Sequence, residues 1–72
     1  MGAVVVIGEP ARVGGYALAG AIVMTAEGAD EARRAWRDLP ASTSLVILTD
    51  STAQALTHEM RESTVPTVVM CP

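Results

Sequence analysis

Two acidic residues are the strongest candidates for chemistry in this sequence. Glu9 lies just after the apolar run Ala3–Ile7, and Asp50 lies just after the apolar run Leu45–Leu48. If both runs are parallel strands, both carboxylates lie at the carboxyl edge of one sheet, where ligands bind in open α/β folds. The simpler interpretation, which we favour, is two solvated carboxylates near helix N-termini, where the helix dipole stabilises negative charge.

The loop from Gly8 to Gly15 has the position of a phosphate-binding loop but not its residues. It follows one predicted strand and precedes a predicted helix, where backbone N–H groups can bind an anion. A dinucleotide-binding loop would need two more glycines in register, and a P-loop needs a lysine followed by serine or threonine. The chain contains no lysine. We therefore expect no cofactor, and we interpret Gly8, Glu9 and Pro10 as a structural turn.

The other reactive side chains have no partners in the sequence. His58 lacks a second histidine at metal-ligand spacing, and nothing orients it as a base. Cys71, the only cysteine, has no neighbouring histidine or helix N-terminus to activate it. Trp36 is expected to belong to the core. We therefore expect no catalytic and no metal-binding residue, and a small enzyme dependent on Asp50 is the least supported interpretation.

Composition argues against nucleic-acid and membrane partners. The net charge is −3, all five basic residues are arginines and 3% of the residues are aromatic, so a broad basic face and stacking platforms are missing. Arg33, Arg34 and Arg37 alternate with Asp30 and Asp38 and predict a solvated, ion-paired helix face. The uncharged stretch 13–26 is too short and glycine-rich to span a bilayer. With one cysteine and no recognisable signal peptide, we expect a cytoplasmic protein.

Four apolar runs predict strands, and three amphipathic segments lie between them. The runs read as strands buried on both faces; they are Ala3–Ile7, Ala21–Thr25, Leu45–Leu48 and Thr67–Met70. The predicted helices are Ala11–Ala19 behind Pro10, a segment from the cap Gly28 to Leu39, and a segment opened by the capping box 51–54 and closed at Ser63.

Periodicity also predicts which side chains each helix buries. These are Val13, Tyr16, Ala17 and Gly20 in the first helix, Ala29, Ala32, Trp36 and Leu39 in the second, and Ala53, Leu56, Met60 and Thr57 in the third. Gly14 and Gly15 weaken the first helix, so they either delay its start or allow close approach of another backbone.

The order of these elements predicts that residues 1–72 form one α/β domain. Its four-stranded parallel sheet would be doubly wound, Rossmann-like or flavodoxin-like, with right-handed crossovers and three helices. If the first helix covers one face and the other two cover the opposite face, the first face keeps exposed apolar surface. Such a patch marks an interaction surface, and an isolated chain that carries it can form a homo-oligomer.

The segment Val4–Ala21 resembles the start of the F subunit of V-type and A-type ATPases. In that family a strand ending in glycine and an acid precedes a Val-x-Gly-aromatic-x-Leu-Ala-Gly stretch. The matching residues here are Gly8, Glu9, Val13, Gly15, Tyr16, Leu18, Ala19 and Gly20. The stretches 45–56 and 65–72 are similar to later parts of the family. The sequence departs at Gly14, Ala17 and Met70, where the family usually has Thr, Arg and Glu, and it ends at Pro72 without the helical tail of longer members.

This resemblance implies a non-catalytic component of the central stalk of a rotary ATPase. It would bind the elongated coiled-coil D subunit of the stalk, along with other rotor subunits, and help couple ATP hydrolysis or synthesis to proton or ion transport. It would reach the membrane only as a peripheral part of that complex, without inserting into it. We expect the partner to contact Val13, Gly15, Tyr16 and Ala19, because small residues permit close approach and tyrosine offers an anchor.

The alternative is a regulatory module that resembles the receiver domains of response regulators. Receivers have paired acids after the first strand, an acceptor aspartate after the third and a lysine near the end of a fifth strand. Glu9 and Asp50 would fill acidic positions, but Pro10 follows Glu9, and the fifth strand and the lysine are absent. Such a module would self-associate through the same exposed face.

Overall fold

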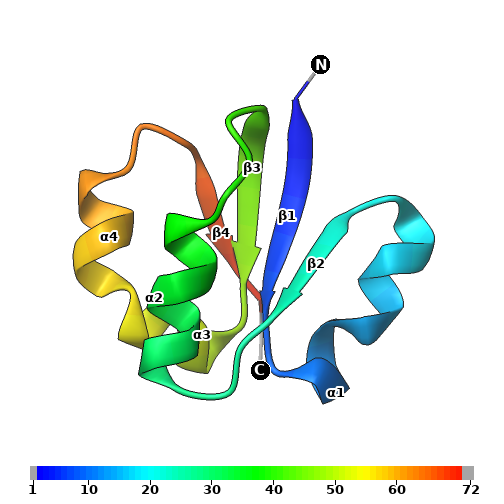
Figure 1. Ribbon diagram of the computed structural model, residues 1–72, viewed down its shortest axis with the longest axis horizontal. Helices are drawn as coiled ribbons and strands as arrows, with labels where there is room; N and C mark the ends of the chain where they lie inside the picture. The colour runs from blue at the N-terminus through cyan, green and yellow to red at the C-terminus, as the bar shows by residue number, and fades with distance from the viewer. Residues whose placement is uncertain (1, 71–72) are drawn as a thin grey trace.

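The computed structural model describes residues 2–70, which form one parallel sheet with helices on both sides (Figure 1). The strands are β1 (Ala3–Gly8), β2 (Ile22–Thr25), β3 (Thr43–Leu48) and β4 (Thr67–Val69). The helices are α1 (Pro10–Val13), the 3₁₀ helix η1 (Gly14–Ala19), α2 (Ala29–Arg37), α3 (Asp50–Ala55) and α4 (Thr57–Glu62). Cys71 lies outside the described residues.

The strand order is β2-β1-β3-β4, with every neighbouring pair parallel. The chain therefore moves from β1 to one edge and then crosses back over β1 to build the other half of the sheet. With right-handed crossovers, this reversal places α1 and η1 on one face and the remaining helices on the opposite face. The predicted four-stranded, doubly wound α/β fold is confirmed.

The larger core lies between the sheet and α2, α3 and α4, which gather on the left in Figure 1. Strand residues that point to this face alternate with residues that point away. The buried core side chains are Val5, Ile7, Ala26, Ala32, Ala35, Val46, Leu48 and Leu56. Trp36, Leu39 and Met60 pack against this cluster as half-buried side chains, so the expected core role of Trp36 is confirmed.

The opposite face has a much smaller core under α1 and η1, which pack against β1 and β2. Val6 and Val13 are fully buried there, outside the main cluster. Gly8 allows this close packing, because a side chain on Gly8 would overlap the Thr49 methyl group and lie 3.0 Å from Val13 Cγ1. On this face, therefore, α1 and η1 cover the half of the sheet that β1 and β2 form.

Burial along β3 corrects the expectation of strands buried on both faces. Val46 and Leu48 are buried, but Leu45 and Ile47, which point to the opposite face, are only half-buried. On β4, Val68 and Val69 are both exposed. An apolar run predicts a strand, but the helices packed around the sheet decide whether both faces of that strand are covered.

The first predicted helix is wrong beyond Val13. The chain changes from an α-helix to a 3₁₀ helix at Gly14, and Ala17 and Gly20 do not join the core: Gly20 is exposed and ends η1 with a φ of 89°. Two consecutive glycines weaken an α-helix by about 1 kcal/mol each relative to alanine. Gly14 and Gly15 both have open space where a side chain would lie, so close approach of a backbone does not explain them.

The third predicted helix is divided in two at Leu56, whose backbone angles of φ −108° and ψ 21° leave the helical region. Leu56 is nonetheless fully buried, as expected, while Thr57 is exposed. The helix also begins earlier than the predicted capping box, at Asp50 with Thr49 as the N-cap residue. The Ser51 and Thr49 hydroxyls bond elsewhere, to Glu9.

The second helix follows its prediction more closely. It begins after Gly28, whose φ of 120° favours glycine, and Glu31 Oε1 accepts a 3.0 Å hydrogen bond from the Glu27 N–H. Its buried face includes Ala32, as predicted, and also Ala35. Ala29 is exposed, so the buried face begins one turn later than the periodicity predicted.

Candidate functional site

Hydroxyl groups surround Glu9 at the carboxyl edge of the sheet. Glu9 Oε1 accepts hydrogen bonds from Ser51 Oγ at 2.6 Å and from Thr49 Oγ1 at 2.7 Å. Thr49 Oγ1 also lies 2.9 Å from Thr52 Oγ1. β1 supplies the acid just beyond its end, and the junction of β3 with α3 supplies the hydroxyls. This cluster joins the two central strands by side chains.

The hydrogen bond from Ser51, and then that from Thr49, hold the pKa of Glu9 below its ordinary value of 4.5. A lowered pKa means that the carboxylate stays ionised and is a weak proton acceptor at neutral pH. The geometry thus suits a structural link between β1 and β3 better than a general base.

Asp50 does not join this cluster. Its Oδ2 accepts a 3.2 Å hydrogen bond from Gln54 Nε2 on the next turn of the chain, and no described hydrogen bond connects it to Glu9. The two acids meet the same edge of the sheet but have separate partners. Within residues 2–70, no group of histidine and acidic residues gathers that could hold a metal ion.

The pocket beside Glu9 is small. Its volume is about 90 Å³, and Ala26, Ala29 and Ala55 form part of its wall with Ser51. Sites for small molecules usually have several hundred Å³. The pocket beside Glu9 is therefore smaller than the usual site for a small molecule.

The predicted partner-contact residues divide between the core and the surface. Val13 is fully buried and offers a partner no surface. Gly15 and Ala19 are exposed, and Tyr16 is half-buried. Tyr16 and Ala19 form one wall of a hollow of about 400 Å³ whose opposite wall includes Ile47.

Beyond this hollow lies apolar surface that no described element covers. Leu45 and Ile47 of β3 are half-buried, and 50% of Val68 is exposed. We call Leu45, Ile47 and Val68 the apolar strip. The sequence predicted that the face under the first helix would be incompletely covered; Val68 agrees with this, but Val69, which points to the opposite face, is 43% exposed, so neither face is fully covered at β4. It did not identify these residues, which were expected to be buried on both sides.

No protein-family model matches this chain, and neither a curated protein nor a solved structure is significantly similar to it. The resemblance to the F subunit of rotary ATPases therefore stays a prediction from the sequence motifs.

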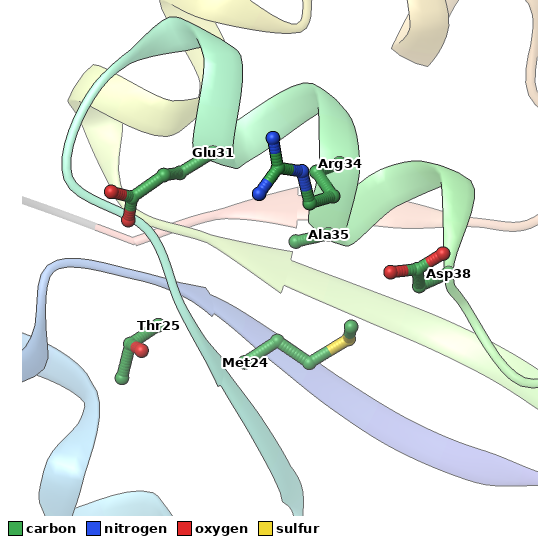
Figure 2. Close-up of a pocket in the computed structure, with 6 residues that line it drawn as sticks. All are labelled: Met24, Thr25, Glu31, Arg34, Ala35 and Asp38. Carbon is green, nitrogen blue, oxygen red and sulfur yellow. The ribbon is translucent and has the colours of Figure 1, made fainter.

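A second hollow of about 360 Å³ separates α2 from the edge strand β2. Figure 2 shows Arg34 between Glu31 and Asp38 on the helix, with Met24 extending from the strand below. One cation and two carboxylates leave this hollow with a net charge of −1, which does not favour an anionic ligand. Beside it, Arg33 Nη1 and Asp30 Oδ1 form an exposed ion pair at 3.2 Å, as the sequence predicted for this helix face.

The remaining reactive residue lies away from both hollows. His58 is exposed on α4. The part of the chain that the structure describes also has no helix long and apolar enough to cross a membrane. The strongest candidate for a functional surface is therefore the apolar strip with the hollow beside η1.

Proposed function

We propose that this protein is a non-catalytic, partner-binding component of the central stalk of a V-type or A-type rotary ATPase, similar to the F subunit of those enzymes. The observation that carries the proposal is the apolar surface that stays exposed on β3 and β4. Val68 exposes half of its surface beside the half-buried Ile47. Exposed apolar surface of this kind marks an interaction site.

The sequence motif supports the same proposal independently. The matching residues from Gly8 to Gly20 lie in the turn after β1, at the end of α1 and along most of η1. In the proposed complex the protein binds the coiled-coil stalk protein, contacts other rotor subunits and lies at the cytoplasmic side of the membrane as a peripheral part. Its role is to help couple ATP hydrolysis or synthesis to proton or ion movement.

The polar groups of the protein agree with a subunit that does no chemistry of its own. The Glu9 carboxylate accepts hydrogen bonds from Thr49 and Ser51, and the Asp50 carboxylate accepts one from Gln54. The receiver-like alternative needs a shared acidic site, and this separation of the two acids gives it no support.

Binding to the coiled-coil stalk protein of the same organism tests the proposal. The two purified proteins should form a stoichiometric complex in size-exclusion chromatography. At a partner concentration 100 times the Kd, linkage adds about 2.7 kcal/mol of stability, which raises the Tm of a domain this small by about 10 °C or more. An unrelated coiled coil of equal length is the control. A monomer with an unchanged Tm at micromolar concentrations of the stalk protein contradicts the proposal.

A further inference from the structure

The outer edge of β2 is the longer of the two open edges of the sheet. Within residues 2–70, β2 pairs with β1 alone, over four residues, whereas β4 at the other edge has three. The N–H of Ala26 donates a 2.9 Å hydrogen bond to the carbonyl of Gly8 on β1. Because backbone groups alternate in direction along a strand, the N–H and C=O groups of Val23 and Thr25 point away from β1.

The sequence of β2 does not protect this edge. Natural edge strands carry charged residues, proline or a bulge, because free backbone groups can pair with another chain. The strand Ile22–Thr25 contains neither a charge nor a proline, and its register with β1 is continuous. The edge strand β4, by contrast, is shorter and follows Pro66. The backbone of β2 is therefore the better template for a further strand.

The hollow beside β2 has a row of three charged side chains above it. Glu31, Arg34 and Asp38 lie on one side of α2, three and four residues apart (Figure 2). Within the part of the chain that the structure describes, the ion pair of α2 joins Arg33 to Asp30. Arg34 is therefore ion-paired with neither neighbouring carboxylate, and the row offers a ligand negative, positive and negative charge in turn.

The length of this charge row suits an extended peptide. Seven residues of helix separate its ends by about 10 Å, and three alternate side chains on one face of a strand span about 13 Å. Long basic side chains take up the difference. Glu31 keeps one carboxylate oxygen for a ligand, because Oε1 is the oxygen that accepts the bond from the Glu27 N–H. Met24 and Ala35 form the apolar part of the hollow.

Charge complementarity defines the sequence of such a peptide. The residues that face α2 must be basic, acidic and basic at alternate positions. This chain has no such segment, because its only two basic residues four positions apart are Arg33 and Arg37, and Ala35 lies between them. A second copy of the chain therefore does not match the charge row, and the matching segment belongs to another protein.

We propose that the outer edge of β2 binds an extended segment of another protein as a fifth strand, with basic, acidic and basic residues facing Glu31, Arg34 and Asp38. Backbone hydrogen bonds to Val23 and Thr25 provide affinity, and the charge row provides specificity. This surface lies at the opposite edge of the sheet from β4. It is independent of the apolar strip and of the stalk assignment.

A capped peptide of eight residues tests the proposal on the complete chain. It carries lysine, glutamate and lysine at its second, fourth and sixth positions, with valine and threonine elsewhere. The control peptide has the same composition with the order lysine, lysine, glutamate. Amide NMR should show shifts for Val23, Thr25 and α2 with the first peptide, and at least tenfold weaker binding of the control. Equal affinities, shifts confined to other elements, or no binding at millimolar concentration overturn the proposal.

Two arginines in the last turn of α2 provide a matched pair of variants. Both are exposed, but Arg34 lines the hollow and Arg37 lies outside its lining. Arg34→Glu should weaken binding of the first peptide at least tenfold and favour a peptide with three lysines, which restores the complementarity. Arg37→Glu should change both affinities less than twofold. Equal effects of the two variants, with folding checked by circular dichroism, overturn the role of the charge row.

Methylation of the peptide backbone tests whether the peptide binds as a strand. The backbone nitrogens that face β2 form one alternate set along the peptide, so methylating that set should abolish binding while methylating the other set should not. Equal effects of both sets overturn strand addition. A dimer in analytical ultracentrifugation that the peptide dissociates would assign the edge to a second copy of the chain and would also overturn the proposal.

Discussion

Ser51 donates a 2.6 Å hydrogen bond to Glu9 across 42 positions of sequence, and so ties the start of α3 to the end of β1. We predict that Ser51→Ala lowers the free energy of unfolding by about 0.5–1 kcal/mol at pH 7, because a partly exposed, charge-assisted bond is lost. Urea unfolding measures this change. A variant as stable as the wild type would show that the bond contributes nothing.

The same bond predicts a dependence on pH. Its partner Glu9 has a pKa below the ordinary value of 4.5, chiefly because of Ser51. A group whose pKa is lower in the folded state contributes stability above its unfolded pKa, and this stability is lost as the pH falls through the folded pKa. The difference between wild type and Ser51→Ala should therefore be constant above pH 5 and shrink below about pH 4.5. A difference that grows with acid would contradict this assignment.

Two glycines should respond to alanine in opposite directions. At Gly8 a methyl group overlaps Thr49 and lies 3.0 Å from Val13 Cγ1, so Gly8→Ala should cost about 2 kcal/mol through overpacking. At Gly14 no atom lies within 4 Å, and φ is −55°. Gly14→Ala should therefore add about 0.5–1 kcal/mol by reducing the entropy of the unfolded chain. Thermal unfolding of both variants checks the pair, and equal signs would contradict the packing described here.

Leu56 should be one of the most sensitive positions in the chain. It is fully buried where α3 and α4 meet, so Leu56→Ala should cost about 3 kcal/mol through lost burial and a cavity. That is a large share of the total stability of a small domain. His58→Ala, two residues away on the exposed side, is the control and should lie within about 0.5 kcal/mol of wild type.

The architecture could be predicted from the sequence because each strand is encoded by a short local run of apolar residues. The runs around Val5 and Val46 are apolar and β-branched, and the turns between them fix the order of the elements. The 3₁₀ helix was missed because periodicity describes an ideal α-helix, while Gly14 and Gly15 decide the local geometry. The break at Leu56, whose side chain stays fully buried, was missed because the apolar spacing continues through it.

The candidate site was predicted only in part, because its contacts are tertiary. Glu9 was recognised, but its partner Thr49 was not, since 40 residues separate them. The choice of Val13 as a partner contact was wrong for a similar reason: the crossover turns its side chain toward the sheet, where it is fully buried. Ile47 was missed because an apolar strand does not reveal which of its faces has a covering helix.

The central proposal is that the coiled-coil stalk protein binds this protein over the apolar strip. Methyl NMR tests it most directly, with the stalk protein added to saturation. We predict large shifts for the methyl groups of Ile47 and Val68, and small shifts for Val46, which is buried on the opposite face. Shifts confined to the carboxyl edge around Glu9, or to the α2 face, would contradict the claim.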